Sequence, residues 1–145
     1  MDLHPFFVHF PISLFFIAFL MEILNFKITW IHKNVPMFIF VLATIFTIPS
    51  SITGDSAEYE AGQIIGIYET LNNHETMGTI LTISGIFFSF LLLIIQLKFP
   101  HKSINKLKFA VFLLFTLMVF YTGFLGGKLV KDFGAGVKLK VEQKN

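Results

Sequence analysis

The chain has 145 residues and a net charge of +2 at pH 7; 54% of its residues are hydrophobic, 20 of them are Phe, and only 14% are charged. Soluble domains carry about 25% charged residues, so the composition excludes an ordinary soluble domain and predicts an integral membrane protein. The small net charge predicts no nucleic-acid partner. The absence of cysteine excludes disulfides, thiolate metal sites and iron–sulfur ligation by this chain.

Four apolar stretches follow one another, at residues 5–24, 36–53, 73–97 and 104–126. A helix that crosses a bilayer needs about 20 mainly apolar residues, and each stretch meets or approaches that length. We therefore predict an all-α, integral membrane four-helix bundle over residues 1–127, followed by a polar, lysine-bearing tail over residues 128–145. Gly54 and the pair Gly126 and Gly127 are expected to end the second and fourth helices.

The connection between the second and third helices contains a short amphipathic segment. Ile64, Ile67, Tyr68 and Leu71 recur at helical spacing, which predicts a segment that lies on the membrane surface or covers the bundle. The next helix is expected to begin near Asn72. No internal repeat is evident in the sequence.

The distribution of lysine gives the expected orientation. The first and third connections hold Lys27, Lys33, Lys98, Lys102, Lys106 and Lys108, whereas residues 55–72 contain no Lys or Arg. Because cytoplasmic loops are enriched in Lys and Arg, both termini are expected outside the cytoplasm. Five tail lysines nearly cancel this bias.

Ionisable residues within spans need a partner or a function, because each is costly in hydrocarbon. With four alternating helices, most of them fall at one end of the bundle: His4, His9, Asp55, Glu58, His74, Glu75 and Tyr121. Glu22 lies at the other end, where pairing at the interface is expected. His32 and His101 are expected to be solvated residues of the lysine-bearing connections.

Two imidazoles on facing helices are what bis-histidine haem b ligation requires. We predict His9 and His74 as this pair, with Pro11 tilting His9 inward and His4 at the rim as a neighbouring residue or alternate ligand. Gly78 and Thr82 continue the His74 face with small side chains, which would let a flat ring approach the helix.

The same histidines allow a second reading, a site for a divalent metal ion. His4, His9 and His74 would bind it together with carboxylates from Asp55, Glu58 or Glu75. No phosphate-binding loop or catalytic triad signature occurs, so hydrolase or nucleotide chemistry has no support in the sequence.

The opening segment His4-Pro5-Phe6-Phe7-Val8-His9-Phe10-Pro11-Ile12 resembles the H-P-x-x-V-H-F-P-I motif of an uncharacterised bacterial membrane-protein family, domain of unknown function 2231. Thr53-Gly54-Asp55, His74, Gly126-Gly127-x-Leu129-Val130 and Gly134-x-Gly136-Val137 are similar to later landmarks of that family. The resemblance implies a four-helix membrane domain and, through redox modules fused to relatives, a redox role.

These observations predict a haem b protein of the bacterial inner membrane that transfers electrons, with redox proteins or quinone as partners. The alternatives are a metal-ion binding or transport component and a non-catalytic assembly subunit of a membrane redox complex. The sequence does not indicate an oligomeric state, a substrate or a catalytic residue.

Overall fold

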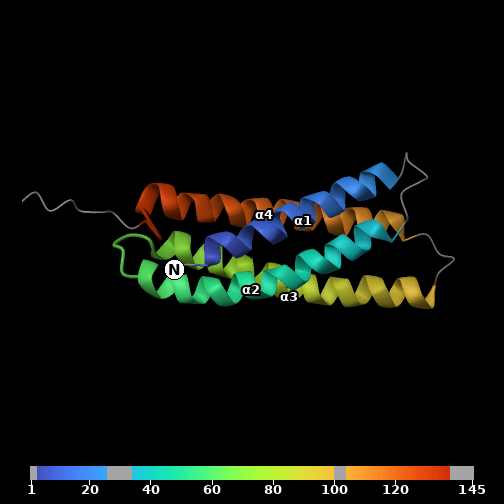
Figure 1. The fold of residues 1–145 in the computed structure, drawn as a ribbon, viewed down its shortest axis with the longest axis horizontal. Helices are drawn as coiled ribbons and strands as arrows, with labels where there is room; N and C mark the ends of the chain where they lie inside the picture. The colour runs from blue at the N-terminus through green and yellow to red at the C-terminus, as the bar shows by residue number, and fades with distance from the viewer. Residues whose placement is uncertain (1–2, 26–33, 100–103, 138–145) are drawn as a thin grey trace, which may run out of the picture.

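The computed structural model describes residues 3–25, 34–99 and 104–137 of the chain, without the side chain of residue 60. Four long helices account for nearly all of this part: α1 (His4–Asn25), α2 (Val35–Ala61), α3 (Tyr68–Lys98) and α4 (Asn105–Phe133). They lie side by side, and the N-terminus, the turn at residues 62–67 and the end of α4 share one end of the molecule (Figure 1). The predicted all-α four-helix bundle is confirmed.

Neighbours in the chain are neighbours in space. α1 packs on α2 and α4, and α3 packs on α2 and α4, so α1 lies diagonally opposite α3 and α2 lies diagonally opposite α4. All four helices are long and apolar enough to cross a membrane. The protein is therefore a multi-pass membrane protein.

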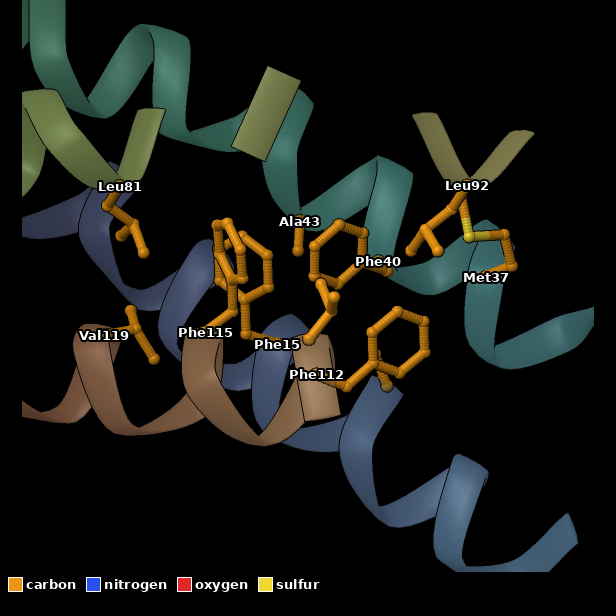
Figure 2. Packing of buried hydrophobic residues seen from close by; sticks show 11 residues of the cluster. Phe15, Met37, Phe40, Ala43, Leu81, Leu92, Phe112, Phe115 and Val119 are labelled. Atoms are coloured by element: carbon orange, nitrogen blue, oxygen red, sulfur yellow. The ribbon is translucent and has the colours of Figure 1, made fainter. Parts of the chain in front are cut away.

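The core is built mainly from aromatic rings in the middle of the bundle (Figure 2). Phe40 of α2 stacks on Phe112 of α4 with ring centroids 4.6 Å apart and an angle of 10° between the planes. Phe15 and Phe115 pack around this stack and are also fully buried. Many large apolar side chains point outward instead, such as Phe38 and Phe124. On a soluble protein such a surface would be a liability, whereas lipid covers it in a bilayer.

Two predicted helix ends are wrong. α2 continues through Gly54 to Ala61, and α4 continues through Gly126 and Gly127 to Phe133. Gly134 follows the last residue of α4 as its C-cap. Its φ of 70° is the left-handed conformation that favours glycine at the C-terminus of a helix. Within these helices, Gly54 and Gly126 each lie close to a histidine ring of a neighbouring helix.

The connection between α2 and α3 is shorter than expected. Ile64 and Ile67 belong to the turn at residues 62–67, and α3 already begins at Tyr68, four residues before the predicted start. Ile67 and Leu71 are nevertheless buried against Leu129 of α4, with Ile64 packed beside them. The segment therefore covers this end of the bundle with its apolar side chains.

Candidate functional site

His4 stands in the first turn of α1 and points across to α2. Its ring Nδ1–H donates to the main-chain carbonyl of Ser50 at 2.9 Å, and the hydroxyl of Thr53 lies 3.4 Å from the same nitrogen. A carbonyl oxygen can only accept, so Nδ1 carries a hydrogen, and a neutral ring bonded in this way has its lone pair on Nε2.

His74 makes the equivalent contact in the second half of the chain. It lies one to two turns into α3, is half-buried, and its Nδ1–H donates to the carbonyl of Thr122 on α4 at 3.0 Å. The same reasoning places a hydrogen on Nδ1 of His74. A hydrogen bond from the other ring nitrogen is the usual arrangement for histidines that ligate a metal, because it fixes the tautomer and the ring orientation.

The two rings meet inside one end of the bundle. Their centroids are 6.2 Å apart and their planes are nearly perpendicular, at 88°. Each ring rests against a glycine: a Cβ at Gly54 would lie 3.2 Å from Cε1 of His4, and a Cβ at Gly126 would lie 3.2 Å from Cε1 of His74. This His4–His74 pair, with the two glycines behind it, is the candidate site.

His9 lies elsewhere, and its predicted inward orientation is wrong. Its side chain is exposed, and its Nδ1–H donates to the carbonyl of Pro5 on its own helix. The reason is the phase of α1, which begins at His4 and buries Pro11 and Phe15. Stepping back seven residues from Pro11 along this buried stripe leads to His4, whereas His9 faces outward.

The small residues predicted below His74 divide between two roles. A Cβ at Gly78 would meet no atom within 4 Å, so one turn below His74 there is open space beside α3. The Thr82 hydroxyl donates to the carbonyl of Gly78 and is satisfied within its own helix. Gly85 is buried, and a Cβ there would lie 3.2 Å from the side chain of Thr44, so this glycine serves helix packing.

The carboxylates named for a metal ion lie at the same end of the molecule. Glu58 is half-buried, with the side chains of Glu75 and Asp55 near by. Asp55 and Glu75 are exposed. Across residues 3–25, 34–99 and 104–137, no three His, Asp or Glu side chains gather closely enough to hold a metal ion.

At the opposite end of the bundle, sequence reasoning missed a buried ion pair. Lys108 of α4 donates to the carboxylate of Glu22 on α1 at 3.1 Å, and both side chains are almost fully buried. Pairing of Glu22 was expected, but with a partner at the interface. Lys108 was counted among the loop lysines. Its partner Glu22 lies 86 residues away, so the sequence did not reveal the pair.

Other predicted residues play no part in the His4–His74 pair. Tyr121 is exposed on α4. His32, His101 and residues 138–145 of the expected tail lie outside the described residues.

A family comparison agrees with this picture. The family model described as "Predicted membrane protein (DUF2231)" matches residues 1–139. The chain belongs to this family. A search of curated proteins and a search of solved structures each found no match.

The landmarks of the DUF2231 resemblance meet at one place in the bundle. His4 of the opening motif contacts Gly54 of the Thr53-Gly54-Asp55 element, and His74 contacts Gly126 of the closing double glycine. Segments that are distant in the sequence thus converge on the two imidazoles.

Proposed function

We propose that the His4–His74 pair holds haem b and that the protein transfers electrons within the membrane. The observation that carries the proposal is that the His4 and His74 rings make the same hydrogen bond through Nδ1. They come from diagonally opposite helices, and each bonds its Nδ1–H to a main-chain carbonyl, which in the neutral ring leaves Nε2 as the nitrogen that can ligate a metal.

The residues present fit this group. His4 and His74 would hold the haem iron through their imidazole nitrogens. The centroids of the two rings are 6.2 Å apart. The open space beside Gly78 lies on the same helix one turn below His74. His4 thus takes the ligand position that the sequence suggested for His9.

With two histidine ligands, haem b would supply one-electron transfer without an open coordination position. The partners would be redox proteins or a membrane quinone. A divalent metal ion is less well supported, since a stable site takes four or more ligands and, among the side chains that the structure describes, two imidazoles converge here.

A visible absorption spectrum of the detergent-purified protein, expressed with haem supply, tests the proposal. The wild type is expected to show a Soret band and sharp α and β bands after dithionite reduction. His4→Ala and His74→Ala are expected to lose them. His9→Ala is the matched control, because His9 stands on the same helix as His4 but is exposed, and it should keep the full spectrum.

The other outcomes are equally informative. A colourless wild type would contradict the haem proposal and direct metal analysis to the same two histidines. A colourless protein whose histidine variants leave its cellular role intact would favour the assembly-subunit alternative.

We place the protein in the bacterial inner membrane with both termini, and therefore the histidine end, outside the cytoplasm. The support is the lysine-free stretch at residues 55–72, which lies at the same end as the N-terminus (Figure 1). Because the chain has no cysteine, a single introduced thiol reports its own side of the membrane.

Gln63 and Asn105 are exposed at opposite ends of the bundle and suit this test. A membrane-impermeant maleimide on intact spheroplasts is expected to label Gln63→Cys and to label Asn105→Cys only after permeabilisation. The reverse pattern would overturn the orientation.

A further inference from the structure

The two halves of the chain repeat the same contacts, although their sequences show no evident repeat. His4 donates to a carbonyl of α2, the helix that follows it, and His74 donates to a carbonyl of α4, the helix that follows it. The two acceptors, Ser50 and Thr122, are 72 residues apart, as are Gly54 and Gly126, the glycines that touch the rings. The hairpin of α1 and α2 and the hairpin of α3 and α4 therefore share one pattern of contacts.

The same 72-residue offset recurs deeper in α2 and α4. The hydroxyl of Thr44 donates to the carbonyl of Phe40, and the hydroxyl of Thr116 donates to the carbonyl of Phe112. The two phenylalanines stack on each other between the diagonal helices. A residue that stacks on its own counterpart lies where a two-fold axis along the bundle would pass, as it does in parallel membrane repeats.

The hydroxyls of the two acceptor residues follow the same rule. Ser50 donates to the carbonyl of Phe46, and Thr122 donates to the carbonyl of Met118. The ring acceptors, the glycines and the back-bonded hydroxyls of α2 and α4 therefore match under one offset of 72 residues, whereas the two histidines are 70 residues apart.

The motif Ser/Thr-x-x-x-Gly explains how a helix can receive an imidazole. In an α-helix the carbonyl of residue i points toward residue i+4, whose side chain leans back over that carbonyl. With glycine at i+4 the second lone pair of the oxygen stays open to a ring on the neighbouring helix. A Cβ at Gly54 would lie 3.4 Å from Nδ1 of His4, and one at Gly126 would lie 3.6 Å from Nδ1 of His74.

We infer that the site consists of two equivalent imidazole seats related by this pseudo-two-fold axis. Gly54 and Gly126 are the positioning residues, each leaving room for one histidine ring whose Nδ1–H bonds to a main-chain carbonyl of the following helix. The ligand class is a metal centre with two equivalent positions on opposite sides. This last step rests on the proposed haem function, whereas the equivalence of the two seats does not.

Nitrogen NMR of ¹⁵N-histidine-labelled, haem-free protein in detergent tests the two seats directly. Single His→Gln variants would assign the signals. In the wild type, both His4 and His74 are expected to carry the hydrogen on Nδ1. If either histidine carried its hydrogen on Nε2 instead, this measurement on the wild type alone would overturn the inference.

Alanine at each glycine then tests the positioning role. Gly54→Ala is expected to shift the ring signals of His4, and Gly126→Ala those of His74, since each added methyl group would press on its ring. Gly127→Ala is the control, because it lies on the same helix and a Cβ there meets nothing within 4 Å. An effect at Gly127 equal to that at Gly126, or an effect at only one of the two seats, would contradict the inference.

Added hemin separates the two proposals. Both seat variants are expected to lose affinity for hemin by about tenfold or more, and by similar factors, while Gly127→Ala retains it. If wild-type protein gives the expected NMR pattern but binds no hemin, the haem function fails and the equivalent seats remain. If hemin binds but the two seat variants differ in their effects, the haem function remains and the equivalence of the seats fails.

Discussion

The two ends of the bundle both bury polar side chains among apolar ones, but they satisfy them in different ways. At one end, Glu22 and Lys108 carry opposite charges and neutralise each other at 3.1 Å. At the other end, His4 and His74 have the same side chain, and each donates its Nδ1–H to a main-chain carbonyl of a neighbouring helix.

The difference indicates how to separate structural from functional polar groups in a membrane protein. An ion pair between two helices is complete and holds α1 against α4 without a third component. The two imidazoles are instead oriented by main-chain carbonyls, the arrangement on which the proposed ligand site rests. The comparison predicts that substitutions at the two ends affect different properties.

The largest effect on stability is expected at the ion pair. Glu22→Leu or Lys108→Leu leaves one buried charge without its partner, which costs about 3–5 kcal/mol, whereas the double variant should recover most of that loss. Unfolding in detergent micelles titrated with dodecyl sulfate, followed by circular dichroism, measures the change. A double variant as unstable as the sum of the single variants would show that the pair is not a closed unit.

A smaller effect on stability is expected at the histidine end in the absence of haem. His4→Ala or His74→Ala removes one neutral hydrogen bond, worth about 0.5–1.5 kcal/mol. The contrast sharpens when hemin is added at 100 times its Kd, because binding should stabilise the wild type by about 2.7 kcal/mol and leave the variants unchanged. The same unfolding titration with and without hemin checks this, and stabilisation of the variants by hemin would contradict the assignment of the ligands.

The fold was largely predictable, because long apolar stretches in a chain of this length leave few alternatives to a four-helix membrane bundle. The helix ends were less predictable. Gly54 and Gly126 read as stops in the sequence, since glycine often ends helices in water. In a membrane bundle the same residue permits close approach, and here each glycine admits an imidazole.

The site was predictable in part. The sequence predicted that His4 and His74 share one end of the bundle, and their rings do lie close together there, whereas the choice between His4 and His9 as the partner of His74 depended on the phase of α1. The buried stripe of Pro11, Phe15 and Ala18 would have indicated His4. The partner of Glu22 was beyond the sequence, because it depends on how α1 packs against α4.

The smallest effect is expected where neutral hydroxyls join helices between the two ends. The hydroxyl of Ser89 on α3 donates to that of Thr44 on α2 at 3.1 Å in a buried position. Such bonds between membrane helices average about 0.6 kcal/mol, since a hydroxyl that loses its partner can bond back to its own helix. Ser89→Ala should therefore cost that much in the unfolding titration.

Ser84→Ala is the matched control for this bond, because the Ser84 hydroxyl donates to carbonyls of its own helix. It is expected to change the free energy of unfolding by less than about 0.5 kcal/mol. A loss at Ser89 as large as that at Glu22 would remove the distinction between a charge that needs its partner and a hydroxyl that does not. A loss near the average would show that the buried charges of Glu22 and Lys108 depend on each other more than the hydroxyls of Ser89 and Thr44 do.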